Sequence, residues 1–173
     1  MIFNLFRKST APDTVFEAYR SIVAQSRQAK FYADWGIPDT VTGRFDMISL
    51  HLALLLRRLK GNEEARPFGQ ALVDLFFRDM DRSVRELGIT DLGVPKRIKK
   101  MGNVFYGLVK AIDDAIDSGS QVEVEAVLLK NVYPAPNPGV AQLASYLLAE
   151  SKLLTALPTA TITAGQSTSG VAA

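Results

Sequence analysis

The stretch GRFDMISLHLALLLRRLK, residues 43–60, decides the fold. A helix that is apolar on every side is normally surrounded by other helices, and the leucines of this stretch lie nearly all the way round a helical wheel, at positions 50, 52, 54, 55, 56 and 59. Gly36 and Pro38 precede it in a turn, and Gly61 follows it, so the pattern predicts one helix from about residue 40 to residue 60. We expect this helix to be the central, most buried one.

Helical spacing of apolar residues predicts further helices on both sides. They cover residues 13–31, 63–87, 121–133 and 140–154, and one more carries a packing stripe of Ile98, Met101, Phe105, Leu108, Ile112 and Ala115. The Val-Glu alternation near residue 122 is also typical of a strand, but no partner strand is predicted elsewhere. The fold is therefore expected to be all-α: a single compact domain of about six helices over residues 13–155, between an N-terminal segment, 1–12, and a flexible low-complexity tail, 156–173.

The composition excludes several classes of function. The 20 basic and 18 acidic residues give a net charge of +2, which argues against a protein that neutralises many phosphates. There is no cysteine and one histidine, so disulfides, iron-sulfur clusters, thiolate catalysis and the usual zinc sites are excluded, and we expect no metal and no cofactor. The longest unbroken apolar run, residues 52–56, is far shorter than the roughly 18 residues that cross a bilayer.

Two patterns could indicate catalysis or ligand binding. DDAID, residues 113–117, matches the Asp-Asp-x-x-Asp pattern with which helical prenyl-transfer enzymes hold magnesium diphosphate, but a second acidic motif is missing, which favours a solvated helix end. His51, among leucines, is typical of a core histidine. The alternative is a pocket for a lipid, quinone or haem-like ligand around His51, Asp74 and Tyr106, in which a buried Asp74 would need a basic partner.

The segment FFRDMDRSVRELGITDLGVPKRIKKM, residues 76–101, is unusually rich in charge. Opposite charges four residues apart, such as Asp81 with Arg85, would stabilise a helix by only about 0.2–0.5 kcal/mol per pair. Phe77 is expected at the edge of this charged face, as in many protein interfaces. The cluster Lys96, Arg97, Lys99 and Lys100 could meet phosphates, anionic lipid headgroups or an acidic protein, but it lacks base-stacking aromatics, so we do not expect nucleic acid as the partner. The sequence favours binding over catalysis.

Two long stretches carry a family resemblance: FYADWGIPDTVTGRFDMISLHLALLLRRL, residues 31–59, and FGQALVDLFFRDMDRSVRELGITDLGVPKRIKKMGNVFYG, residues 68–107. They closely resemble the ubiquinol-cytochrome c chaperone family, whose mitochondrial members help to assemble the cytochrome bc complex of respiration. The likeness covers about Asp13 to Leu154, and the block FRDMDRSVRE followed by VPKRIKKM is the part most specific to the family.

The resemblance implies a non-enzymatic assembly factor with an all-helical fold. Its client would be newly made cytochrome b or a related membrane protein, held near the ribosome until haem and further subunits are added, and mitochondrial members work with a small second assembly factor. This chain lacks their presequence and N-terminal extension, so the resemblance implies a bacterial, alphaproteobacterial form in the cytoplasm. Peripheral contact with the inner membrane is a further option, for which Phe3, Phe6, Arg7 and Lys8 would provide a marginal anchor.

A chaperone for a membrane protein needs an apolar surface for its client and charges that set the client's orientation. We expect Gly43, Arg44, Phe45 and Asp46 to fix the start of the buried helix against that surface, with His51 and Asp74 as further structural residues. The predicted docking face consists of Phe77, Arg78, Asp81, Arg82, Arg85, Lys96, Arg97, Lys99 and Lys100.

Overall fold

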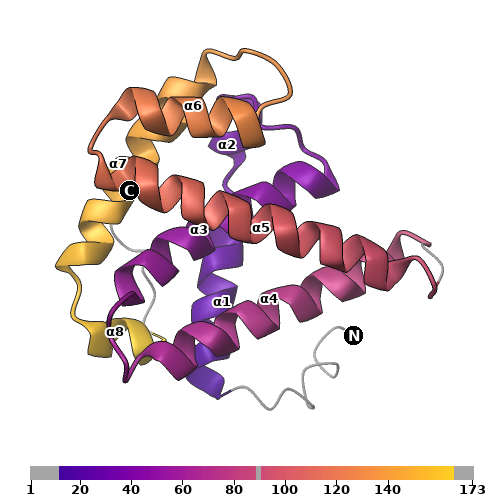
Figure 1. Cartoon of the computed structure of the whole chain (residues 1–173), viewed down its shortest axis with the longest axis vertical. Helices are drawn as coiled ribbons and strands as arrows, with labels where there is room; N and C mark the ends of the chain where they lie inside the picture. Colours follow the sequence, from indigo (N-terminus) through magenta and orange to yellow (C-terminus); the bar gives the residue numbers. More distant parts are fainter. Residues whose placement is uncertain (1–11, 89–90, 166–173) are drawn as a thin grey trace.

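The structure, a computed structural model, describes residues 12–88 and 91–165. These residues form eight helices and no strand (Figure 1). The helices are α1 (Asp13–Ser26), α2 (Ala29–Ala33), α3 (Val41–Leu59), α4 (Arg66–Glu86), α5 (Val94–Asp117), α6 (Gln121–Asn131), α7 (Gly139–Ala156) and α8 (Thr159–Thr163). The all-α prediction is confirmed.

Helix α3 is the central helix, as predicted. It packs against α1, α4, α5 and α7, and its residues from Phe45 to Leu55 are all buried. A helix with leucines on every side removes apolar area from water only if neighbours cover every side, and burying one such side chain fully is worth about 1.5–3 kcal/mol. The leucines of residues 50–59 thus bring four other helices around α3.

The start of α3 is fixed by its first turn and by the loop before it. Thr40 caps the helix, since its hydroxyl accepts a hydrogen bond of 3.1 Å from the Gly43 amide. Arg44 donates to Asp39 at 2.8 Å on the surface, and Phe45 stacks on Phe76 of α4 with ring centroids 5.4 Å apart. Gly43, Arg44 and Phe45 therefore lie at the junction of α3 with the loop before it and with α4.

One predicted helix differs from the structure. The first predicted helix, 13–31, is interrupted at Arg27 and Gln28, so that α1 and α2 are separate helices. The helix predicted near Val122 is confirmed as α6, and Ser120 caps it by accepting from the Glu123 amide. Alternation of Val and Glu over only four residues is compatible with the residue spacing of a helix and with that of a strand. The serine cap favours the helix.

The prediction of a flexible tail from residue 156 is wrong for its first part. Helix α8 follows α7 after a short turn at Leu157 and Pro158, and it packs against α1 with Ile162 buried. A single apolar residue in TATIT gives almost no periodic signal, although it suffices to anchor one helical turn to an existing core. Residues 166–173 of the predicted tail and residues 1–11 lie outside the described part.

Helices α4 and α5 pair to form a long hairpin. Figure 1 shows the end of α4 and the start of α5 reaching beyond the other helices. Val84 and Val94 are buried between them, with Ile98 and Met101 half-buried along the same seam. The predicted docking face lies wholly on this hairpin.

Candidate functional site

An aromatic cluster joins the hairpin to the core. Phe105 is fully buried, and its ring lies 5.0 Å from that of Phe76 and 5.5 Å from that of Phe77. Phe77 is half-buried and stacks on Tyr106, which is 58% exposed, at a centroid distance of 6.2 Å. Phe77 therefore lies at the edge of the apolar interior, in contact with Tyr106.

The charges of α4 largely pair with one another. Arg82 donates to Glu86 at 3.0 Å, and Arg85 bridges Asp81 and Asp91, both at 2.7 Å. Exposed pairs of this kind contribute little to stability, about 0–1 kcal/mol. Their effect on the surface is to hold both guanidinium groups against neighbouring carboxylates.

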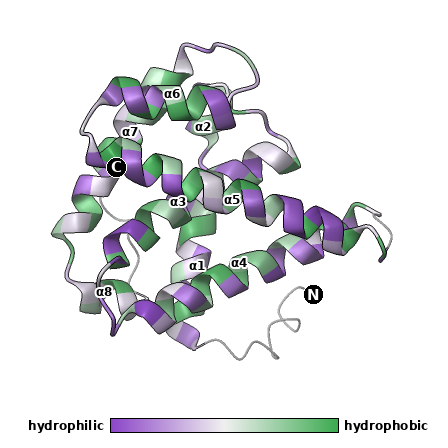
Figure 2. Ribbon diagram, viewed as in Figure 1, coloured by the Kyte–Doolittle hydropathy of each residue, from purple (hydrophilic) through white to green (hydrophobic). Residues whose placement is uncertain are grey.

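The cations of α5 are arranged differently. Lys96, Arg97, Lys99 and Lys100 are all exposed, and within the described residues none of the four forms an ion pair. Figure 2 shows hydrophilic residues along this outer part of α5. We call these four residues the basic ridge. The hairpin thus combines a neutralised charged surface on α4 with an uncompensated positive one on α5.

Asp46 and Asp74 differ in burial, and Asp74 does not lie where the sequence predicted. Asp74 is exposed and accepts a hydrogen bond of 2.9 Å from Gln70, so the prediction of a buried Asp74 with a basic partner is wrong. Asp46 is only 4% exposed, and burial raises the pKa of its carboxyl group to about 7. Asp46 is therefore a buried acid, as is Glu150, whereas Asp74 is not.

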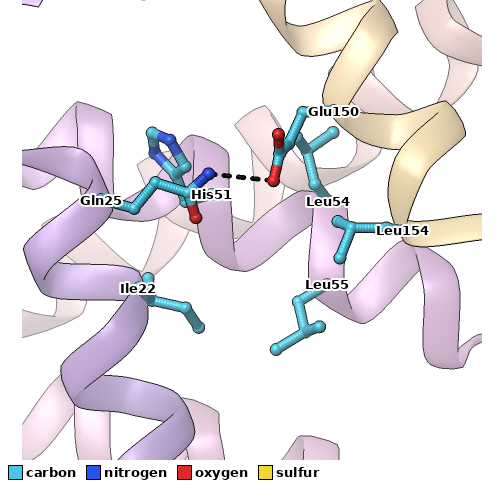
Figure 3. A pocket seen from close by; sticks show the side chains of 7 residues that line it. All are labelled: Ile22, Gln25, His51, Leu54, Leu55, Glu150 and Leu154. Carbon is cyan, nitrogen blue, oxygen red and sulfur yellow. Dashed lines mark hydrogen bonds between the residues drawn. The ribbon is translucent and has the colours of Figure 1, made fainter. Parts of the chain in front are cut away.

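His51 belongs to a buried polar chain between α1, α3 and α7. Its Nδ1 lies 2.7 Å from the carbonyl oxygen of Met47, which can only accept, so Nδ1 carries the proton and Nε2 is the acceptor. The hydroxyl of Tyr146 donates to Nε2 at 2.9 Å and in turn accepts from Gln25. Gln25 also donates to Glu150 at 2.9 Å (Figure 3).

Burial, more than its hydrogen bonds, keeps His51 neutral. Burial lowers the pKa of His51 to about 4, against the opposing effect of its bond to the Met47 carbonyl. The imidazole also lies edge-on to Phe31 at 5.6 Å. Both ring nitrogens are occupied by partners within the protein, which is the geometry of a core histidine.

The structure does not form the predicted ligand pocket. Figure 3 shows the cavity beside His51, which is lined by Ile22, Gln25, His51, Leu54, Leu55, Glu150 and Leu154 and measures about 10 Å³. A space of this size holds one water molecule, not a quinone or a haem. Asp74 and Tyr106 are exposed on the hairpin instead of lining this cavity, so the grouping of these two residues with His51 is wrong.

Removal of the Tyr146 hydroxyl tests how much the buried hydrogen bonds around His51 contribute to stability. Burial raises the pKa of Tyr146, so its hydroxyl stays protonated and available to His51. Tyr146→Phe leaves His51 Nε2 and one Gln25 N–H without their partner, and we expect a loss of about 1–3 kcal/mol in the free energy of unfolding. Urea denaturation should show this loss for Tyr146→Phe and almost none for the matched Tyr106→Phe, whose hydroxyl is exposed. Equal midpoints for the two variants would contradict the assigned chain.

The acids of DDAID hold helices together. Asp113 accepts from Arg57 and, at 2.7 Å, from Lys60, while Asp117 accepts from Arg57 at 2.6 Å. Burial alone would raise the pKa of Asp113, but the hydrogen bonds from Lys60 and Arg57 outweigh it and lower that pKa. Asp114 pairs with Lys110 at 2.7 Å. The three carboxylates thus bind cations of α3 and α5, which agrees with a structural role.

Some features of the site had no signal in the sequence. Gln25 and Glu150 meet across 125 positions of the chain, and nothing local predicts that contact. The ammonium group of Lys30 lies 5.1–5.5 Å from the ring centroids of Phe31, Trp35 and Tyr146, a cation–π cluster between α2 and α7. Leu92, at the tip of the hairpin, is 94% exposed, although a leucine is usually buried.

The described part of the chain contains no helix that is both long and apolar enough to cross a bilayer. The hairpin is the feature that extends furthest from the core, and it carries exposed apolar side chains together with cations that form no ion pair within the described residues.

Comparisons with known proteins agree with this geometry. A family model described as ubiquinol-cytochrome C chaperone matches residues 33–169, which include α3 and the whole hairpin. The crystal structure of the Cbp3 homologue from Brucella abortus superimposes with a TM-score of 0.83 at 40% sequence identity, covering 90% of this chain and 87% of that one. A search of curated proteins found no significant match. The chain therefore belongs to the ubiquinol-cytochrome c chaperone family.

Proposed function

We propose that this protein binds cytochrome b, or a related membrane subunit, during assembly of ubiquinol-cytochrome c reductase, and that it does so without catalysis. Membership in the chaperone family supports a client in cytochrome bc complex assembly. The observation that carries the proposal is the α4–α5 hairpin, which extends beyond the other helices and includes the nine residues of the predicted docking face. A small second assembly factor would be an additional partner.

The arrangement of the hairpin suits recognition of a partly apolar client. Phe77 and Tyr106 offer a stacked aromatic surface, and the same hairpin carries the ion pairs Arg82–Glu86 and Arg85–Asp81 further along α4. Aromatic residues and arginine are enriched where protein interfaces gain most of their binding energy. Charges around such a centre select the orientation of the partner more than they add affinity.

Charge reversal on the docking face tests the proposal. Arg82→Glu combined with Lys99→Glu should abolish capture of the client, because one cation of each hairpin helix becomes an acid. Thermal unfolding should be almost unchanged, since both side chains are exposed and the one ion pair lost, with Glu86, is a surface pair. In-cell crosslinking of the tagged protein, followed by mass spectrometry of the recovered proteins, measures capture.

The matched control is Lys130→Glu with Lys152→Glu, the same change of charge on α6 and α7. It should leave recovery of cytochrome b intact. Recovery that is equal in the hairpin variant and the control would show that the docking face is merely solvated. Recovery of no membrane subunit by the unmodified protein would contradict the proposed client.

A further inference from the structure

We propose that the basic ridge and Leu92 together bind the surface of an anionic lipid bilayer. The tip of the hairpin is the contact, with the ridge meeting lipid phosphates and Leu92 entering the boundary between headgroups and acyl chains. This proposal goes beyond client binding and does not depend on which client the protein holds.

The first observation is the distribution of charge along α5. Between Leu92 and Ile112 the chain has five basic residues and no acidic one, although the whole protein is nearly balanced at +2. Lys110, the last of the five, is paired with Asp114. The remaining four, which form the basic ridge, have no ion-pair partner in residues 12–88 and 91–165. Positive charge is thus concentrated without compensation at one end of the molecule.

The second observation is the placement of the ridge on the helix. Ile98 and Met101 alternate with the cations in sequence, and both are half-buried against the core side of the hairpin. At 100° per residue, Lys96, Lys99 and Lys100 then lie on the side of α5 that faces away from the protein. The ammonium groups of these three lysines therefore point outwards together over about one and a half helical turns. This arrangement suits contact with the phosphates of a lipid surface.

The third observation is the exposed leucine beside the ridge. Leu92 is 94% exposed in the turn before α5, the most exposed of the large hydrophobic side chains in the described residues. An apolar side chain next to several cations is the pattern of proteins that lie on anionic membranes, where burial of apolar area adds to attraction by the lipids. The leucine has no packing role in the protein that would explain its position.

The same features argue against nucleic acid as the partner. Single-stranded binding needs aromatic rings on which bases stack, and the ridge has none within it. The nearest exposed ring, that of Tyr106, already stacks on Phe77. A protruding leucine gains nothing from a phosphate backbone, whereas it gains from the acyl boundary of a bilayer.

Vesicle co-sedimentation with the purified full-length protein tests the proposal. The probes are vesicles of phosphatidylcholine alone and of phosphatidylcholine mixed with phosphatidylglycerol, at low and at physiological salt. We expect binding to the mixed vesicles only, and weaker binding at the higher salt because the Debye length shortens to about 8 Å. Lys96→Gln with Lys100→Gln should lower the partition coefficient roughly 30-fold, on the order of fivefold for each lysine. Leu92→Ser should weaken the binding that persists at the higher salt.

The control is Lys130→Gln with Lys152→Gln, which removes the same charge from α6 and α7 and should bind as the unmodified protein does. Circular dichroism melting checks that all variants are folded. Vesicle binding that survives in the ridge variant would place the contact elsewhere, such as the N-terminal segment, and would overturn the proposal. Absence of vesicle binding, or ridge-dependent binding to an RNA in place of vesicles, would overturn it too.

The two surface tests are separable. Leu92 is not part of the docking face, so a Leu92→Ser protein that still captures its client but binds vesicles less at the higher salt supports both proposals. Loss of client capture in the Arg82 and Lys99 reversal, together with full vesicle binding by the Lys96 and Lys100 variant, would retain the proposed function and reject the membrane contact.

Discussion

Gly43→Ala should destabilise the protein by about 3 kcal/mol, one of the largest effects expected for a single methyl group. A Cβ at position 43 would lie 2.0 Å from the carbonyl oxygen of Pro38, which is backbone and cannot rotate away. That carbonyl also accepts from the Thr40 amide, so moving it disturbs the turn that begins α3. The free energy of unfolding from urea denaturation is the measurement.

Gly107→Ala is the matched control, because this glycine lies within α5 and a Cβ there would meet no atom within 4 Å. Alanine favours a helix by about 1 kcal/mol over glycine, so this variant should be more stable than the unmodified protein. The two substitutions are chemically identical and should have opposite signs. A Gly43→Ala protein with an unchanged midpoint would show that the loop before α3 yields freely, and that Gly43 does not fix the helix.

The comparison of Gly43 with Gly107 shows how far the sequence determines this fold. The continuous leucine pattern predicted α3 and its central place, because a helix that is buried on every side has apolar residues at nearly every position of its sequence. The close approach of Pro38 to Gly43 has no such pattern, since it depends on the path of a loop. A glycine in the sequence does not by itself show whether a Cβ at that position would clash with a neighbouring part of the chain.

The acids illustrate the same limit for the candidate site. Asp74 lies between Val73 and Leu75, which suggested burial, yet on a helix it points away from Phe76 by about 160° and into solvent. Asp46 is buried because α3 is covered on all sides, a consequence of tertiary packing. The docking face was predicted as a group because its residues are close in sequence, whereas the Gln25–Glu150 contact depends on two distant helices meeting.

The two buried titratable groups of α3 should oppose one another as the pH changes. His51 has a pKa of about 4 in the folded protein and an ordinary value of 6.5, mainly because burial disfavours its charged form. Between these values the unfolded chain binds the extra proton, so stability falls as the pH is lowered, by up to about 3 kcal/mol. Asp46 has a folded pKa of about 7 against 3.8. Here the folded protein holds the extra proton, so stability rises as the pH is lowered, by up to about 4 kcal/mol.

Because the two windows overlap between about pH 4 and 6.5, the contributions of His51 and Asp46 should nearly cancel in the unmodified protein, and single substitutions should separate them. Above pH 7 the unmodified protein buries an ionised Asp46 carboxylate and the Asp46→Asn variant does not, so the variant should be the more stable of the two. As the pH is lowered through this range, the unfolding free energy of the variant should fall by about 3 kcal/mol relative to that of the unmodified protein. His51→Gln should show the opposite relative slope. The difference in unfolding free energy between each variant and the unmodified protein, measured by urea denaturation across this range, removes the contribution of the other carboxylates. Parallel curves for all three proteins would mean that both groups titrate as they do in water, and that α3 is less enclosed than its packing implies.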